Sequence, residues 1–227
     1  ASVGIRARVK GFLTQMDFIE GKSVKAGQRL FVIEPQPFQA KVDSAQGALD
    51  RSLAEEAFQK VQYERMKTLV AKGAISHAQY DETKAKYEAA IGQVQVQRGN
   101  LEDAKINLSY CYVNSPIEGI IGERKVDVGN LVGAGGDTLL ATVVKLDPLY
   151  VQFSPSTQDF ADFLNHRQQQ PFPVEVRLPH VPNLLLKGSV NLVNNEVATS
   201  TSTVLMRASI HNPEPWLLPG LYVRITL

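Results

Sequence analysis

The most regular hydrophobic pattern in the chain lies in its first half and predicts two helices. In residues 38–72 apolar and small side chains recur in steps of three or four, which places them on one helical face: Phe38, Val42, Ala45, Leu49, Leu53, Ala57, Val61 and Leu69. A second run follows one seven-residue frame: Tyr80, Tyr87, Ile91, Val94, Leu101 and Leu108, with Lys84, Arg98 and Lys105 at the polar positions. This frame predicts a coiled-coil seam interrupted by charge.

The break between the two runs predicts a tight turn and therefore an antiparallel hairpin. Gly73 suits the position just past a helix end, and Ser76 with Gln79 three residues later has capping-box spacing. Arms of roughly 35 residues span about 50 Å at a rise of about 1.5 Å per residue. A two-helix stalk of that length projects from a small domain, so we expect it to bridge or dock rather than to enclose a pocket.

Short β-type runs punctuated by glycine flank the hairpin, and the two flanks repeat each other. Gly11, Gly21 and Gly27 are matched, at a constant offset of 108 residues, by Gly119, Gly129 and Gly135. The glycines predict tight turns that need positive φ. Each half is too short to bury a core alone. We therefore expect the halves to pack as one small β-sandwich that the hairpin divides.

The last third of the chain predicts a small antiparallel barrel. Strand patterns occur at 149–153, 174–178, 186–193, 204–211 and 221–227. Ser156 or Thr157 is placed to cap a short helix that reaches Leu164, and 165–173 has loop composition. The expected fold class is an elongated, multidomain α+β protein.

Composition narrows the function classes. Lys and Arg number 24 against 23 Asp and Glu, for a formal charge of +1, so bulk charge does not favour nucleic acid or an acidic membrane. The single cysteine, Cys111, lies in an apolar run and excludes an intrachain disulfide. No apolar run reaches about 18 residues, the length that predicts a membrane span.

No motif for catalysis or cofactor binding stands out. The four histidines, His77, His166, His180 and His211, show no metal-ligand spacing. The run Gly133-Ala134-Gly135-Gly136 lacks the Lys-Ser/Thr of a phosphate-binding loop and is better explained as a turn between strands. We therefore predict a protein that is not an enzyme and has no metal or cofactor.

The predicted turn of the hairpin carries the most informative polar cluster. Arg65 and Leu69 lie one turn apart on one helix, and Ser76 opens the next. An Arg with its fork of donors, a Leu for a groove and an outward Ser would form a docking surface for other helices. A purely structural explanation also fits, with Leu69 in the seam, Ser76 as a cap and Arg65 in solvent.

With the split repeat, the hairpin and this tip together, the chain resembles the periplasmic adaptor proteins, or membrane fusion proteins, of tripartite resistance-nodulation-division (RND) multidrug efflux pumps. The resemblance covers essentially the whole chain and rests on the order and spacing of several motifs: Arg8-Val9-Lys10-Gly11-Phe12-Leu13, Phe18-Ile19-Glu20-Gly21, Val24-Lys25-Ala26-Gly27, Leu30-Phe31-Val32-Ile33-Glu34-Pro35, Phe38-Gln39-Ala40, Ser115-Pro116-Ile117-Glu118-Gly119, Leu139-Leu140-Ala141-Thr142-Val143, Leu146-Asp147-Pro148-Leu149-Tyr150-Val151, Asn212-Pro213 and Leu217-Leu218-Pro219-Gly220-Leu221-Tyr222-Val223.

The resemblance implies four parts: a lipoyl-like domain from 1–36 plus 109–145, a helical hairpin over 37–108, a β-barrel over 146–227, and a membrane-proximal domain that is largely absent from this chain. It also implies that Arg65, Leu69 and Ser76 engage an outer-membrane channel of the TolC type. The barrel would face a proton-driven inner-membrane transporter, and six adaptors, as a trimer of dimers, would form a ring. The location implied is the periplasm, with an N-terminal anchor to the inner membrane outside this chain.

Two departures from the family pattern bear on these expectations. Thr201-Ser202-Thr203 stands where relatives often have Thr-Gly-Thr, which leaves the shape of that turn open. No lysine occupies the turn tip where a lipoyl or biotinyl carrier is modified, so no covalent cofactor is expected. The alternatives are an adaptor for type I secretion or heavy-metal export and, in another class, the carrier domain of a multienzyme complex.

Overall fold

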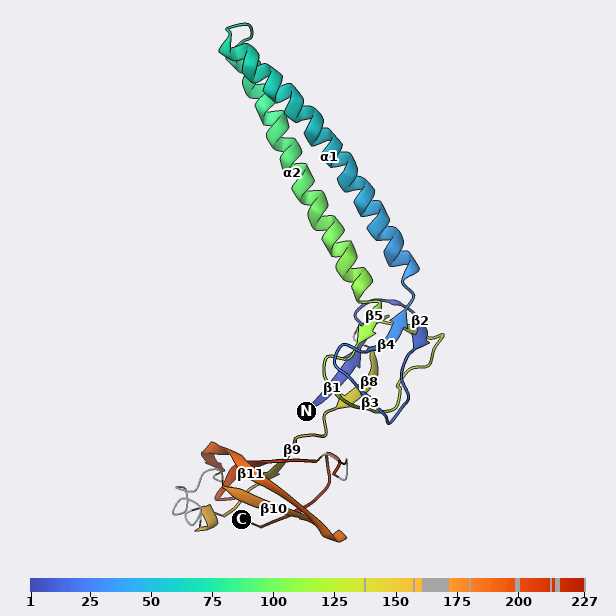
Figure 1. Cartoon of the computed structure of the whole chain (residues 1–227), viewed down its shortest axis with the longest axis vertical. Coiled ribbons are helices and arrows are strands. Elements are labelled where there is room, and N and C mark those ends of the chain that lie inside the picture. Colours follow the sequence, from blue (N-terminus) through green and yellow to red (C-terminus); the bar gives the residue numbers. More distant parts are fainter. Residues whose placement is uncertain are drawn as a thin grey trace.

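A computed structural model describes residues 1–136, 138–156, 158–160, 172–179, 181–198, 201–212, 214 and 217–226, with the side chains of 181–184 excepted. Figure 1 shows a pair of long helices, a two-sheet β-domain and a further sheet following one another along an elongated molecule. In the described part of the chain, neither long helix has the apolar composition needed to cross a membrane.

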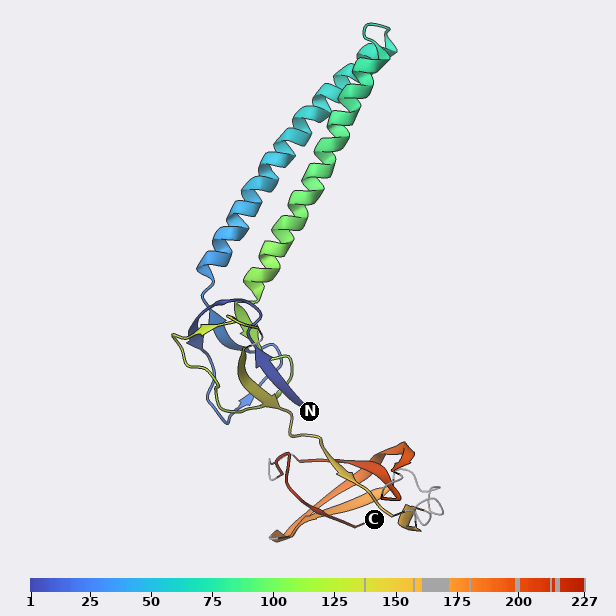
Figure 2. The same cartoon turned by 180° about the vertical axis from the view of Figure 1, so that it is seen from behind.

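The helices are α1 (Gln36–Ala71) and α2 (His77–Ser109). Pro37 lies in the first turn of α1, where its missing N–H and fixed φ do no harm. Both views show the two helices side by side along their length and joined at the end farthest from the sheets (Figures 1 and 2). The predicted helical segments are thus found within two residues of their expected limits.

The residues between the two helices differ in part from the predicted seam. Tyr80, Tyr87, Val94, Leu101 and Leu108 are buried or half-buried as predicted, but the positions alternating with them are Thr83, Ala90, Gln97 and Ala104. Ile91 is 41% exposed, and Lys84, Arg98 and Lys105 are exposed. The charged residues therefore do not interrupt the seam.

The outer half of α1 shows the same correction. The predicted face residues Leu53, Ala57 and Val61 are exposed, whereas the polar residue Ser52 is buried and Glu56 and Gln59 are half-buried. Steps of four from Leu49 to Val61 drift around a helix that turns every 3.6 residues, and the structure keeps an alternation of three and four instead. Leu49, Val94 and Leu101, with Val42 and Ala45 beside them, form a buried apolar cluster between the helices.

Eight strands build the β-domain below the helices. They are β1 (Ser2–Arg6), β2 (Gly11–Met16), β3 (Ser23–Val24), β4 (Arg29–Ile33), β5 (Tyr112–Asn114), β6 (Gly119–Ile121), β7 (Leu131–Val132) and β8 (Leu139–Val144). They form two four-stranded sheets in the orders β1-β8-β6-β3 and β5-β4-β2-β7. Exchanging each strand with its counterpart in the other half converts one order into the other, so the sequence repeat is also a repeat of topology.

Strand pairing between the halves explains why neither half is sufficient. Gly11 pairs with Val132, and 108 residues on, Gly119 pairs with Val24. Each sheet thus contains two strands from each half. The shared core contains side chains from both halves that are at most 3% exposed, among them Leu13, Leu30, Phe31, Ile33, Cys111, Ile121, Val132, Leu140 and Val143. Burial of each large side chain contributes about 1.5–3 kcal/mol.

The repeated glycines serve two purposes. Gly21, Gly27, Gly129 and Gly135 have positive φ, as predicted for tight turns. Gly11 and Gly119 instead lie in strands, where a Cβ would approach the Ile33 side chain to 2.7 Å and the Val144 carbonyl oxygen to 2.5 Å. For this pair the prediction of positive φ was wrong, because close packing excludes a side chain there.

The C-terminal part forms one antiparallel sheet in the order β13-β10-β11-β12-β9. Its strands are β9 (Leu149–Phe153), β10 (Pro173–Leu178), β11 (Val181–Ala198), β12 (Thr203–Ile210) and β13 (Arg224–Thr226). β11 is longer than predicted, and β13 is shorter. The predicted helix and the loop after it fall mostly outside the described residues. Of the predicted helix, residues 158–160 are described, and they are helical.

The turn between β11 and β12 answers the question that Thr201-Ser202-Thr203 raised. Ser202 has a φ of 52°, the left-handed conformation that glycine adopts most easily. Its N–H donates to the Ala198 carbonyl at 2.8 Å, and the hydroxyls of Thr201 and Thr203 lie 2.8 Å apart. The turn thus keeps a glycine-like backbone without glycine.

Residues 145–148 connect the β-domain to the C-terminal sheet, and buried Asn212 fastens this connection. Its side-chain nitrogen donates to the carbonyls of Leu146 and Leu217, at 3.1 and 3.2 Å. Asp147 Oδ1 accepts from the Asn212 N–H at 2.9 Å and lies 2.9 Å from His211 Nδ1. On the β-domain side, Lys145 pairs with Glu118 at 2.8 Å.

Candidate functional site

The turn at the far end of the helices closes with a well-defined set of backbone bonds. Gly73 has a φ of 70°, its N–H donates to the Val70 carbonyl at 3.0 Å, and the Ala74 N–H donates to the Leu69 carbonyl at 3.0 Å. This is a Schellman motif, which satisfies carbonyls that the end of α1 would otherwise leave unpaired. Leu69 therefore has a fixed backbone position at the tip while its side chain remains half-buried.

Ser76 begins α2 with a reciprocal cap, as its spacing to Gln79 predicts. The Gln79 N–H donates to Ser76 Oγ at 3.3 Å, and Gln79 Oε1 accepts from the Ser76 N–H at 3.2 Å. The Ser76 hydroxyl also lies 3.3 Å from Gln79 Oε1. These bonds confirm the capping role of Ser76. Because the residue is also exposed, its outer side remains open to a partner.

Arg65 stands one helical turn before Leu69 and is exposed. Within the described residues its guanidinium has no hydrogen bond or ion pair. Its five N–H donors are thus available to a partner's carboxylates or carbonyls. Arg65, Leu69 and Ser76 come from the two helix ends that meet at this turn, and together they form what we call the tip cluster.

Three tyrosines stiffen the hairpin just below the turn. The Tyr63 and Tyr80 hydroxyls lie 3.2 Å apart, and the Tyr63 ring stacks on Tyr87 with centroids 5.4 Å apart. The hydrogen bond between the two hydroxyls, with some desolvation, raises the pKa of Tyr80. The sequence pattern placed Tyr80 and Tyr87 in the seam but missed Tyr63. The signal that could have found it is its separation from Gly73 along the sequence, which lies between the separations of Tyr80 and Tyr87 on the other side of the turn.

The groups considered for chemistry do not assemble into a reactive site in the described part of the chain. Cys111 is fully buried, and burial raises its pKa to about 11. His77 is exposed on α2, His211 pairs with Asp147, and His166 and His180 lie outside the described residues. No three metal-binding side chains come together among the residues described.

Comparison with known proteins matches this architecture over nearly the whole chain. Residues 1–144 match the barrel-sandwich hybrid domain of RND membrane fusion proteins, and residues 148–227 match the β-barrel domain of the same proteins. The chain belongs to the RND membrane fusion protein family. This membership confirms the resemblance seen in the motifs.

Curated relatives in this family are identical to the chain at about a third of the aligned positions. The multidrug export protein AcrE of Escherichia coli K12 is 36% identical over 97% of this chain and 59% of its own length. The multidrug resistance protein MdtE of the same strain is 34% identical over 96% of the chain and 59% of its own length. The chain therefore spans a little over half the length of these membrane fusion proteins.

A solved structure shows the same fold at low sequence identity. The membrane fusion protein Spr0693 from Streptococcus pneumoniae R6 superposes with a TM-score of 0.70 at 16% identity, covering 100% of this chain and 96% of that one. At this identity the likeness concerns the fold alone. The fold therefore accommodates very different sequences.

Proposed function

We propose that this membrane fusion protein is a non-catalytic periplasmic adaptor that links a proton-driven inner-membrane exporter to an outer-membrane channel for the efflux of drugs and other small molecules. Family membership supports the general role, and the multidrug export and multidrug resistance for which its relatives are named support the cargo. The observation that carries the proposal is the tip cluster, which presents Arg65, Leu69 and Ser76 at the end of a stalk far from the sheets.

The parts of the molecule are assigned accordingly. Residues 1–36 plus 109–145 form a lipoyl-like domain, 37–108 a coiled-coil hairpin and 146–227 the barrel, which faces the transporter. The hairpin's two helices, of 36 and 33 residues, extend about 50 Å at a rise of about 1.5 Å per residue. That length lets the tip reach a channel while the sheets remain near the inner membrane. An N-terminal anchor and a membrane-proximal domain complete the adaptor in this proposal.

Docking through such a small tip requires several copies. The tip cluster offers one free cation, one half-buried leucine and one serine, and contacts of this kind are individually weak. We propose that six copies form a ring as a trimer of dimers, so that each tip contact forms at high effective concentration after the first. The joint is then stable although no single contact is.

Arg65→Glu tests the tip assignment in cells whose drug resistance depends on this protein. Reversal of the charge should abolish export and leave the amount and folding of the protein unchanged, because Arg65 has no partner among the described residues. Arg98→Glu is the matched control, since Arg98 is also an exposed arginine of the hairpin. Normal resistance in the Arg65→Glu strain would reject the tip as the docking site.

Crosslinking identifies the partner directly. His77→Cys in a Cys111→Ser background places one exposed thiol beside Ser76. A crosslink to an outer-membrane channel supports the proposal. Crosslinks to the inner-membrane transporter alone would place the tip at the wrong membrane and overturn it.

A further inference from the structure

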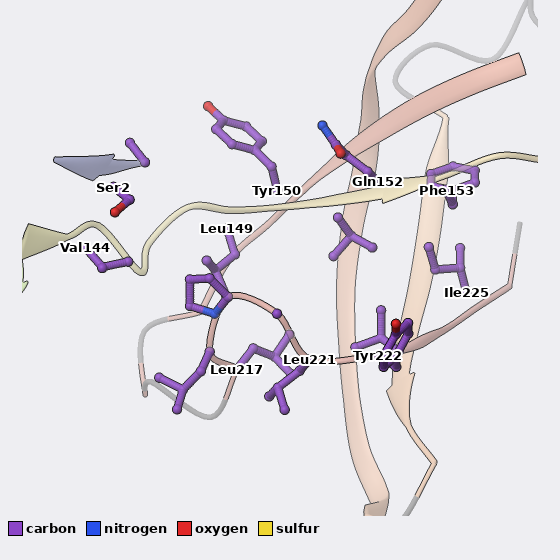
Figure 3. Close-up of a pocket in the computed structure, with 16 residues that line it drawn as sticks. Ser2, Val144, Leu149, Tyr150, Gln152, Phe153, Leu217, Leu221, Tyr222 and Ile225 are labelled. Atoms are coloured by element: carbon purple, nitrogen blue, oxygen red, sulfur yellow. The ribbon is translucent and has the colours of Figure 1, made fainter. Parts of the chain in front are cut away.

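A cavity of about 540 Å³ lies where the β-domain meets the C-terminal sheet. Figure 3 shows it between strand β9 and the segment that runs from Leu217 to Ile225, with Ser2 and Val144 of the β-domain at one end. β9 and β13 are the two edges of the C-terminal sheet. The cavity thus occupies the gap where that sheet is not closed.

The walls of the cavity are mostly apolar. β9 contributes Leu149, Val151 and Phe153, and the facing segment contributes Leu217, Leu221, Tyr222, Val223 and Ile225. Leu149 points toward the loop that carries Leu217 and Leu221, whereas Tyr150 and Gln152 project from the other side of the strand (Figure 3). The Tyr150 ring is instead engaged by the Arg207 guanidinium, 4.6 Å from its centroid.

The main chain of β9 supplies polar groups to this apolar space. The Val204 N–H donates to the Pro155 carbonyl, and the same antiparallel register pairs Met206 with Phe153. Hydrogen bonds along an antiparallel ladder involve every second residue, so Val151 and Phe153 face β12. The N–H and C=O groups of Tyr150 and Gln152 therefore point to the free edge of β9, beside the cavity.

Among the described residues that line the cavity there is no Asp, Glu, Lys, Arg or His side chain, and the amino group of Ala1 at its end is directed to the Lys145 carbonyl oxygen, 3.5 Å away. An ion would lose its hydration there without gaining a counter-charge. A volume of 300–1,000 Å³, apolar walls and a few fixed hydrogen-bonding groups are the usual features of a small-molecule site.

We propose that this cavity binds an uncharged, largely apolar small molecule that carries one or two hydrogen-bonding groups. The apolar part packs between β9 and Leu217–Val223, and the polar group bonds to the main chain of Tyr150 or Gln152. Because Ser2 and Val144 close one end, the ligand contacts both the β-domain and the C-terminal sheet. The adaptor would thereby bind molecules chemically similar to its proposed cargo.

Fluorescence titration of the purified protein with the neutral probe N-phenyl-1-naphthylamine tests the proposal. We expect saturable binding to one site. Leu221→Gln should weaken it about tenfold, because Leu221 lines the cavity and loss of one apolar side chain from a site has an effect of this size. Leu192→Gln is the control: both leucines are in the C-terminal part and similarly exposed, 47% and 41%, but Leu192 does not line the cavity. Equal affinity in the two variants would overturn the proposal.

A second variant separates lost binding from lost folding. Tyr222 is 92% exposed and lines the cavity, so Tyr222→Ser should preserve the fold and still weaken binding severalfold. An unchanged affinity would count against the site. Dodecanol, a competitor with a long alkyl chain, should displace the probe less effectively than a naphthol; the reverse order would assign the cavity to lipid instead. None of these failures affects the bridging role, which is read from export and crosslinking.

Discussion

Ser76 and Gln79 cap each other at the start of α2, with their two hydrogen bonds at 3.3 and 3.2 Å. Ser76 therefore contributes to the turn as well as to the proposed docking surface, and substitutions must separate the two. Ser76→Asp keeps a capping oxygen and should leave the stability unchanged, whereas Ser76→Ala should cost about 1 kcal/mol. Thermal unfolding measures both. If Ser76→Asp impairs export while Ser76→Ala does not, the exposed side of the residue is the functional one.

The seam between α1 and α2 predicts which apolar side chains hold the hairpin together. Leu101 is 7% exposed and Ile91 is 41% exposed. We expect Leu101→Ala to destabilise the hairpin by about 2–3 kcal/mol and Ile91→Ala by less than about 1 kcal/mol. Hydrogen exchange of the α2 amides reports on the hairpin itself. Equal losses of stability in the two variants would support the seam predicted from the sequence, in which Ile91 takes part.

The difference between the predicted and the observed seam shows what the sequence determines and what it leaves open. Helix limits, the turn at Gly73 and the repeat with its strands followed from local signals and were found as predicted. The seam was predicted less well, because Thr83, Ala90 and Gln97 carry no hydrophobic signal, and small or polar residues occupy a two-helix contact when close approach matters more than apolar area. The residues of the tip cluster came from a motif, but their exposure required coordinates.

Gly119 predicts a large effect of adding a single methyl group. A Cβ at this position would lie 2.5 Å from the Val144 carbonyl oxygen, in the main chain of a buried strand. Gly119→Ala should therefore destabilise the β-domain by about 3 kcal/mol or more. Gly92→Ala is the control: no atom lies within 4 Å of its Cβ position on α2, and helix propensity should stabilise it by up to about 1 kcal/mol. Denaturant unfolding measures the change in free energy of unfolding for both variants. Changes of the same sign would contradict the packing described for Gly119.

Glu118 and Lys145 predict a local response to acid at the junction. The hydrogen bond from the Lys145 ammonium lowers the pKa of Glu118. A carboxyl with a lowered pKa in the folded state contributes stability above its unfolded pKa of about 4.3, and loses it as the pH falls through the folded value. Lys145→Gln should move the Glu118 pKa back up, as followed by NMR titration. The pair is exposed, so the stability above about pH 5 should change little; an unmoved pKa would show that the ion pair does not form.

Cys111 predicts a thiol that reports unfolding of the β-domain. It is fully buried in the core shared by both halves, and burial raises its pKa to about 11. At about pH 8 roughly one thiol in a thousand would then be ionised, and reagents cannot reach it in the folded state. We expect no reaction with a maleimide in native buffer and complete reaction in denaturant. Gly119→Ala should speed the native reaction, because it weakens the same core, whereas Leu101→Ala should not. Rapid labelling of the unmodified protein would mean that the β-domain opens without unfolding.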